Sequence, residues 1–435
     1  MERSSEISGF YKLSVEERRR IVQEWAGLSD EEARTYDFPP GIDPAILSRM
    51  IENVIGAFPL PVGIATHFRV NDRDYLVPMV IEEPSVVAAA SNSAKVARAA
   101  GGFTAQTTAP VMIGQIQVLD CADPAAARFR ILQSRDRLLE AANAKDPMLV
   151  KFGGGARDIE VRIIPSPRGT MVVAHLLVDA RDAGGMNAVN TMCEALAPQI
   201  AQIAGGRVVL RIISNLAIHR LVRASATFPA ELLRTDNASG AEVVEAILDA
   251  HTLALVDPFR CATHNKGIMN GISSVIIATG NDFRAIESGA HTYAAFQARE
   301  GAIVRPLTTY EKDRAGNLVG TIELPMAVGL IGGATAVHPT ARANVKLLGV
   351  RGAQELAQVV ASVGLAQNFA ALRALATEGI QRGHMELHAR NYAVTAGARP
   401  DEVDRVVQRM IAEHTIRLDR AKEIVEERRR GSSGG

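Results

Sequence analysis

The stretch Val178-Asp-Ala-Arg-Asp-Ala-Gly-Gly-Met-Asn-Ala-Val-Asn-Thr-Met192 joins an apolar run to a helical pattern through two glycines. The apolar residues before it predict a strand over 171–179, and the spacing after it predicts a helix over 187–203. Backbone N–H groups at such a helix start can bind phosphate, and glycines let a ligand come close. The stretch is not the GxGxxG fingerprint, and most strand–glycine–helix corners bind nothing. By itself the corner therefore predicts local structure and leaves its ligand open.

The segments around this corner predict a compact domain of the ferredoxin-like kind. They follow one another as β-α-β-β-α-β, which is the split βαβ unit of roughly 100 residues. We expect this domain to occupy 110–216 and to be inserted into a larger α+β domain formed by 1–109 and 217–376. The expected elements are strands at 111–119, 159–164, 171–179 and 207–213 and helices at 124–143 and 187–203.

The flanking segments carry the patterns of surface helices, a hairpin and long apolar helices. A charged amphipathic helix is predicted near the end of the chain. The last five residues, 431–435, read as a disordered tail. The expected elements are helices over 14–33 and 44–52, a hairpin of 64–70 and 75–80, a helix of small residues over 86–100, a helical segment over 347–375 and the amphipathic helix over 402–430.

Composition limits the possible functions. Of 435 residues, 47% are apolar and 22% charged, and Lys plus Arg balance Asp plus Glu at 48 each, so nucleic acid and anionic membranes are not expected partners. Cys121, Cys193 and Cys261 are widely spaced, which fits neither a disulfide framework nor a cysteine metal site. No run approaches the ~18 apolar residues of a membrane span, and the N-terminus lacks a signal sequence. We therefore expect a cytoplasmic protein.

Polar residues gather on both sides of one apolar run in the middle of the chain. Arg260-Cys-Ala-Thr-His-Asn-Lys-Gly-Ile-Met-Asn-Gly271 precedes the run, and Gly280-Asn-Asp-Phe-Arg284 follows it. This pattern suggests a site with Lys266 and Asp282 on its two banks. Asn-Lys-Gly and Gly-Asn-Asp are also ordinary turn sequences, so two exposed turns are the alternative.

Glu82 and Glu83 come directly before Pro84 and a helix of small residues. Acidic residues near a helix start are normal capping chemistry, which gives both glutamates a structural explanation. The helix is expected to be buried, so a glutamate at its start would be partly desolvated. Its pKa would then be raised, which suits a group that carries a proton. The two interpretations of Glu83 remain open on this pattern alone.

His384 and His388 lie four residues apart and could share a helix face. The zinc-protease pattern needs Glu directly after the first His, and Met385 stands there instead. We therefore predict no metal site. His384 follows Gly379 and Gly383, and such a hinge suits a mobile acid or base.

Several motifs together resemble one family. In order they are Glu52-Asn-Val-Ile-Gly56, Glu83-Pro-Ser, Asp182-Ala-x-Gly-x-Asn187, Thr263-His-Asn-Lys-Gly-Ile-Met-Asn270, Gly280-Asn-Asp282 and Gly383-His-Met385. The set resembles hydroxymethylglutaryl-CoA reductase of the class II, bacterial branch, over about residues 14–430.

The resemblance implies reduction of the thioester to mevalonate and CoA by two hydride transfers from a nicotinamide cofactor, or the reverse oxidation. The family's catalytic residues fall on Glu83, Lys266, Asp282 and His384. Lys266 would stabilise the oxygen that gains charge, and Glu83 would carry its proton. Asp282 would hold Lys266 and couple to Glu83. His384 would protonate the departing CoA thiolate.

The resemblance also implies binding residues. In the family the ferredoxin-like domain binds NAD(P), and an aspartate at the position of Asp146 accompanies use of NADH. The bare sequence by itself favours an exposed helix-end role for an Asp before Pro147. Gly184 replaces the family's usual methionine and Met186 fills a variable place, so Met186 either crowds the pyrophosphate or refills lost volume. The substrate positions are Ser85, Asn215, Arg260, Asn270 and Asn368, and the dinucleotide positions are Asp146, Asp182, Gly184, Gly185, Met186 and Asn187.

Family members place the active site at a dimer interface with C-terminal helices closing over it, so we expect a homodimer or an oligomer of dimers and a helical flap at 377–430. Two other functions remain possible. One is a CoA- or dinucleotide-binding protein without catalysis, which the altered Gly184–Met186 stretch suggests. The other is a CoA-thioester enzyme without redox chemistry. Mevalonate synthesis and breakdown use the same residues, so the direction is open.

Overall fold

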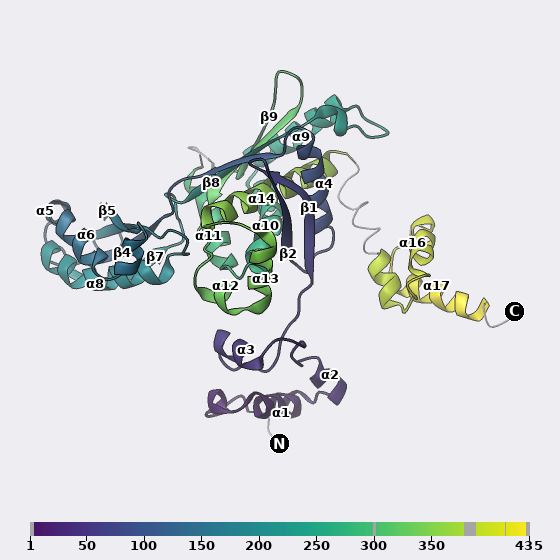
Figure 1. The fold of residues 1–435 in the computed structure, drawn as a ribbon, viewed down its shortest axis with the longest axis horizontal. Helices are drawn as coiled ribbons and strands as arrows, with labels where there is room; N and C mark the ends of the chain where they lie inside the picture. The colour runs from purple at the N-terminus through teal and green to yellow at the C-terminus, as the bar shows by residue number, and fades with distance from the viewer. Residues whose placement is uncertain (1–3, 299–301, 378–388, 414, 432–435) are drawn as a thin grey trace.

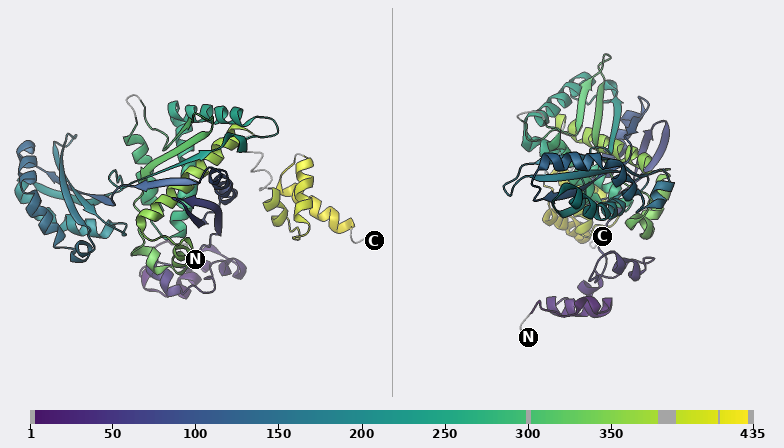
Figure 2. Two further views of the ribbon diagram at one scale, coloured as in Figure 1. Left: turned by 45° about the horizontal axis from the view of Figure 1, so that its top comes forward. Right: turned by 90° about the vertical axis from the view of Figure 1, so that its left-hand side faces the viewer.

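The computed structural model describes residues 4–298, 302–377, 389–413 and 415–431. A central body carries a smaller lobe on one side and a group of C-terminal helices on the other, with the N-terminal helices lying apart from both (Figures 1 and 2). The described residues form two sheets and many helices, which is the mixed α and β fold that the sequence predicts.

The sheet of the central body is built from two segments that lie far apart in the chain. Strands from before and after the smaller lobe meet where β3 pairs antiparallel with β8, with Phe103 opposite Ala226. The strand order is β2-β1-β3-β8-β10-β9. The larger domain is therefore discontinuous in sequence. Its strands are β1 (Val62–Val70), β2 (Arg73–Val80), β3 (Phe103–Thr107), β8 (Leu221–Phe228), β9 (Thr308–Lys312) and β10 (Leu318–Pro325).

Helix α14 (Ala353–Ala376) is the main helix of this core. It contacts α4, α9, α10, β3, β8 and β10. Its length and apolar composition would also suffice to cross a membrane, but 67% of its apolar window is buried inside the protein. The predicted 347–375 segment divides because a turn at residues 349–352 separates α13 from α14. The other elements here are α4 (Val86–Arg98), η2 (Ala230–Leu232), α9 (Gly240–Val256), α10 (Pro258–Ala278), α11 (Phe283–Phe296), α12 (Gly333–Val337) and α13 (Pro339–Leu348).

The smaller lobe is the ferredoxin-like unit. Its four antiparallel strands have the order β5-β6-β4-β7, and its helices pack with them around a separate core that includes Ile116, Leu176 and Met192. The predicted helix over 124–143 is two helices, because the chain bends at Ser134. The elements are β4 (Val111–Leu119), α5 (Pro124–Gln133), α6 (Arg135–Asn143), α7 (Pro147–Lys151), β5 (Gly155–Ile164), β6 (Met171–Asp179), α8 (Met186–Ala204) and β7 (Arg207–Ser214).

The N-terminal segment forms short helices on the surface. Ser14 and Ser29 each begin a helix with a capping box, paired with Glu17 and Glu32. Arg19 ties them to the following loop through the carbonyl oxygens of residues 36 and 55. The elements are η1 (Phe10–Lys12), α1 (Val15–Ala26), α2 (Asp30–Arg34) and α3 (Pro44–Met50).

The C-terminal helices have a core of their own. Ala389, Val406, Met410 and Ile424 are among its buried residues. The single amphipathic helix predicted over 402–430 was wrong, because the chain forms α16 (Val403–Ala412) and α17 (Leu418–Gly431), which pack against each other. An isolated helix would leave its apolar stripe in water, and folding back buries that stripe.

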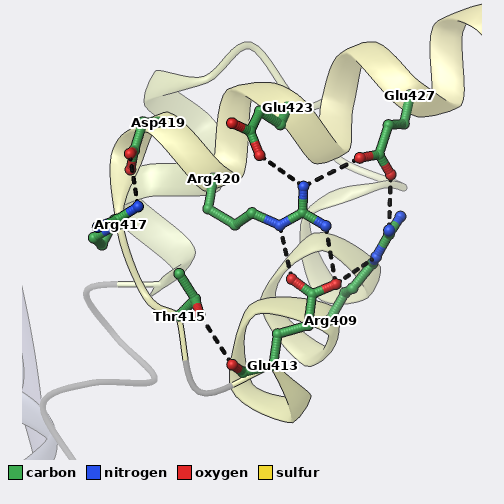
Figure 3. Close-up of polar contacts among 8 residues, drawn as sticks. All are labelled: Arg409, Glu413, Thr415, Arg417, Asp419, Arg420, Glu423 and Glu427. Atoms are coloured by element: carbon green, nitrogen blue, oxygen red, sulfur yellow. Dashed lines mark hydrogen bonds and ion pairs between the residues drawn. The ribbon is translucent and has the colours of Figure 1, made fainter.

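Arg420 links the two helices electrostatically (Figure 3). Its guanidinium donates two hydrogen bonds to Glu413, at 2.7 and 3.0 Å, and one each to Glu423 and Glu427, at 2.8 and 3.1 Å. Arg409 also reaches Glu413 and Glu427. The hydrogen bonds from Arg420 are the largest of the effects that lower the pKa of the Glu413 carboxyl to about 2.

We predict that Arg420→Met loosens the C-terminal helices without affecting the central body. Hydrogen exchange should accelerate for amides in α16 and α17 and stay unchanged in α14. Arg417→Met is the matched control, because among the described residues Arg417 forms an ion pair with Asp419, two positions along the chain. Equal acceleration in both variants would contradict a specific role for Arg420.

The same network predicts a pH dependence. Because the pKa of Glu413 is lowered on folding to about 2, its stabilisation is complete above its unfolded value of roughly 4.3 and is lost as the pH falls toward 2. Exchange in α16 and α17 should therefore lose protection over that range in the wild type, and Arg420→Met should reduce this loss.

Candidate active site

Helix α10 presents three of the candidate residues along one side. Asp257 caps the helix by accepting a hydrogen bond from the backbone N–H of Arg260 at 2.7 Å, and Pro258 starts its first turn. Arg260, Lys266 and Asn270 all line the same cavity. The alternative of an exposed turn at Asn-Lys-Gly is wrong, because Lys266 lies in the middle of a 21-residue helix.

Glu83 reaches across to α10. Its Oε2 lies 3.2 Å from Lys266 Nζ and 3.3 Å from Asn270 Nδ2. The capping explanation does not hold for Glu83, since α4 begins later, at Val86. Ser85 adopts a left-handed conformation, with φ of 75°, which non-glycine residues rarely do. This sharp turn separates Glu83 from α4 and lets its carboxylate face the lysine.

These residues line a cavity of about 650 Å³ between α4, α10 and α14. Its α4 wall is formed by small side chains such as Ala88 and Ala89. Three cations, Arg260, Lys266 and Arg373, line this space together with one carboxylate, Glu83, so the cavity favours an anionic ligand. Partial burial lowers the pKa of the Arg260 guanidinium, which still remains a cation at neutral pH. The structure brings six sequence-predicted residues to this cavity: Glu83, Ser85, Arg260, Lys266, Asn270 and Asn368.

Asp282 does not line this cavity in the structure of the single chain. It caps α11 by accepting from the backbone N–H groups of residues 284 and 285, and it pairs with the side chain of Arg284 at 3.3 Å. Twelve residues of α10 separate Lys266 from the helix end at Ala278, a rise of ~18 Å. The expected contact between Asp282 and Lys266 therefore does not form within one chain, because the length of the helix holds the two residues apart.

The β6–α8 corner has the shape that a phosphate group requires. Gly185 has φ of 94° and directly precedes the 19-residue helix α8. A Cβ on Gly185 would lie 2.9 Å from Ala180 Cβ and 3.0 Å from Met112 Cγ, so only glycine fits. The first N–H groups of α8, including that of Asn187, lack partners within the helix. This corner fits the pyrophosphate of a dinucleotide.

Met186 fills the space beside Gly184. A Cβ on Gly184 would lie 3.1 Å from both Sδ and Cε of Met186. Of the two interpretations of this exchange, the refilling of lost volume agrees with the structure.

Two polar residues anchor the corner to the central body. Asp182 Oδ1 accepts from the backbone N–H of Ala353 at 2.7 Å, so it caps α14 from outside. Arg220 is buried and donates to the carbonyl oxygens of Ala183, at 3.0 Å, and Val328. Burial lowers the pKa of Arg220 to about 10, so it stays charged at neutral pH. Sequence reasoning missed Arg220, because no local pattern distinguishes it from a surface arginine.

Asp282 and Asn215 belong to this second region. The neighbouring Asn281 accepts from the N–H of Gly329 at 2.8 Å, and Gly329 packs directly on the backbone of Gly184. The carbonyl of Asn215 faces Gly289 of α11. The candidate residues therefore form two groups, one at the cavity and one at the β6–α8 corner.

Asp146 caps α7 by accepting from the N–H of Leu149 at 2.9 Å, so its helix-end role is real. Leu149 packs against Gly154, which lies beside the end of β6 at Asp179. Asp146 thus sits at the same end of the lobe as the corner. His384 and His388 lie outside the described residues, and the described residues contain no cluster of three metal-ligating side chains.

The sequence model of the family described as hydroxymethylglutaryl-coenzyme A reductase matches residues 14–389. The chain belongs to this family. The resemblance inferred from the motifs is confirmed.

Proteins similar to this chain in sequence and structure carry the name of the same family. A 3-hydroxy-3-methylglutaryl-coenzyme A reductase of Archaeoglobus fulgidus is 62% identical over 423 residues, covering 97% of this chain and 94% of the relative. A probable enzyme of the same name from Borreliella burgdorferi is 32% identical over 382 residues, covering 87% and 84%. The solved class II reductase of Streptococcus pneumoniae, bound to NADPH in open conformations, has a TM-score of 0.75 and 42% identity, covering 96% of this chain and all of that one.

Proposed function

We propose that this protein is a hydroxymethylglutaryl-CoA reductase, which interconverts hydroxymethylglutaryl-CoA with mevalonate and CoA. The observation that carries the proposal is the ion pair of Glu83 and Lys266 inside a cavity that also holds Arg260. A carboxylate and an ammonium group that face one reacting oxygen can exchange a proton with it and stabilise its charge. Arg260 suits the carboxylate end of the acyl group, because a guanidinium binds carboxylates in a fixed geometry.

The chain's own residues supply charge and protons. When bound at the β6–α8 corner, the nicotinamide dinucleotide supplies the hydride. Lys266 stabilises the thioester oxygen as its carbon is reduced, and the C–S bond then breaks to give an aldehyde and a CoA thiolate. His384 protonates that sulfur. After the second hydride, Glu83 gives a proton to the alcohol oxygen, so two hydrides and two protons are consumed.

Lys266→Ala tests this proposal directly. Wild-type protein should oxidise the nicotinamide cofactor when hydroxymethylglutaryl-CoA is added, and the variant should lose about 10²- to 10³-fold in kcat, the usual loss for a removed oxyanion donor. Lys312→Ala is the control, because Lys312 pairs with Glu245 on the surface. The fall in absorbance of the reduced nicotinamide cofactor measures the reaction rate of the wild type and of both variants. Release of CoA without any cofactor would instead favour a thioester enzyme without redox chemistry.

We infer further that two chains complete each site. Lys266 lies in the middle of α10, whereas Asp282 and the corner lie beyond the C-terminal end of this helix, so a second copy has to bring its Asp282 and its bound dinucleotide to the first copy's Lys266. Symmetric pairing of two such chains forms two equivalent sites. A homodimer is the smallest assembly that satisfies this, and larger assemblies of dimers would preserve it.

Mixing two inactive variants tests the shared site. Lys266→Ala and Asp282→Asn should each be inactive alone, whereas co-expression should restore about a quarter of wild-type activity. Random pairing makes half of the dimers mixed, and each mixed dimer has one intact site. Co-expression that restores no activity would mean that both residues act within one chain.

We propose that NADH is preferred over NADPH. A carboxylate at Asp146 would accept from the ribose 2′-hydroxyl and repel a 2′-phosphate. The position of Asp146 at the corner's end of the lobe supports this, while the solved Streptococcus pneumoniae relative is one that binds NADPH. The unit at 110–216 would bind the cofactor. The larger domain, formed by 1–109 and 217–376, would bind the CoA thioester. The C-terminal segment 377–430 would form the flap that carries His384. A cytoplasmic location agrees with these soluble substrates.

Asp146→Ala should raise KM for NADH and lower it for NADPH, measured by steady-state kinetics with both cofactors. The control is Asp123→Ala, since Asp123 also caps a helix ahead of a proline, with Ala126 N–H at 3.0 Å. Both variants lose a helix cap, which costs about 1 kcal/mol of stability. Only Asp146→Ala should change the ratio of the two KM values, and an unchanged ratio would remove Asp146 as the discriminator.

A further inference from the structure

A chain of buried polar residues lies behind the cavity, on the side of strand β9. Asn368, on α14, is 1% exposed and lines the cavity. Its Oδ1 accepts two hydrogen bonds, from Thr308 Oγ1 and from Tyr310 Oη, each at 2.9 Å. Thr308 and Tyr310 are themselves almost completely buried. The carboxamide oxygen of Asn368 is thus saturated from the side away from the cavity.

The protons in this chain can be assigned from the chemistry of the groups. The oxygen of a carboxamide only accepts, so both hydroxyl groups must donate to it. Thr308 then has to accept from its other neighbour, His264 Nε2, at 2.6 Å. Burial, with smaller contributions from His251 and Arg260, lowers the pKa of His264 to about 3, so at neutral pH the imidazole is uncharged. It therefore carries its proton on Nε2, and donation runs from His264 through Thr308 to Asn368.

The opposite orientation of the amide is disfavoured. If the NH₂ group of Asn368 pointed to β9, the Tyr310 hydroxyl would lose its only recorded acceptor among the described residues. Burial raises the pKa of Tyr310 well above its ordinary value, so the phenol keeps its proton. A buried hydroxyl without an acceptor is costly. The two hydroxyl groups therefore select one of the two amide orientations.

A second set of contacts fixes the position of β9, whose side chains orient the Asn368 amide. Asn265, on α10, is fully buried and donates to the carbonyl of Arg305 at 2.9 Å. Its Oδ1 accepts from the N–H of Leu307 at 3.0 Å. The segment that leads into β9 is thereby fastened to the helix that carries Lys266. The positions of Thr308 and Tyr310 are tied to the same helix as the reacting groups.

We propose that Thr308 and Tyr310 are positioning residues that turn the NH₂ group of Asn368 into the cavity, where it donates to an acceptor oxygen of the acyl group. Within the part of the chain that the structure describes, Asn368 Nδ2 has no recorded protein partner. This inference rests on the proposed function for the identity of the acyl group. A fixed donor of this kind discriminates by the presence of an oxygen, because an analogue without it leaves the NH₂ group unpaired.

The test compares three variants. Tyr310→Phe keeps the ring that packs edge-on against His251 and removes only the hydroxyl. Its KM for hydroxymethylglutaryl-CoA should rise roughly three- to tenfold, the range that one lost hydrogen bond causes, with KM for the nicotinamide cofactor unchanged. Asn368→Asp should have a larger effect, because it presents an acceptor where a donor is required. Tyr293→Phe is the matched control, since this buried tyrosine bonds Glu323 outside the cavity.

A double-mutant cycle decides whether Tyr310 acts through Asn368. In the Asn368→Ala background, Tyr310→Phe should add nothing to the loss of substrate affinity, measured by calorimetric binding of hydroxymethylglutaryl-CoA so that inactive variants remain measurable. Melting temperatures identify any variant that fails to fold, and Thr308→Val then replaces Tyr310→Phe. Additive losses, or a Tyr310→Phe variant that behaves like Tyr293→Phe, would overturn the inference. Wild-type protein that does not oxidise the cofactor would instead overturn the proposed function.

Discussion

The length of α10 is the constraint on which the site depends. One helix carries Arg260, Lys266 and Asn270, and its C-terminal end leads to Asp282, which caps the next helix. A helix cannot shorten without losing its hydrogen bonds, so these groups stay far apart in one chain. The helix is also buried on its other side, through residues such as Ile268 and Ile272, which prevents it from rotating away from the core.

The smaller lobe joins the body through buried polar contacts. Arg220 and Asp182 connect the backbone around Gly184 to the turn at Val328 and to the start of α14. Gly329 packs on the same backbone with no room for a side chain. The β6–α8 corner is therefore held by the central body as well as by its own lobe. A cofactor bound there would have a defined position relative to the core helices.

In the cavity, too, the position of a functional group is fixed by the residues beside it. Glu83 reaches Lys266 because Ser85 takes a left-handed turn, and Asn368 has one orientation because two hydroxyl groups saturate its oxygen. In each case a neighbouring residue determines which group a side chain presents to the cavity. Buried polar groups can do this because an unpaired donor or acceptor is expensive away from water.

The ferredoxin-like order, the start of α8 after Gly185 and the residue types of the site all follow from the sequence, since strand and helix periods and glycine turns are local properties. The break between α16 and α17, the burial of Arg220 and the separation of Lys266 from Asp282 do not, since each depends on what packs against a segment after folding. The family motifs predict that Lys266 and Asp282 belong to one site. Only the tertiary structure decided that one chain keeps them apart, because the residues that follow Lys266 continue the same helix as far as Ala278.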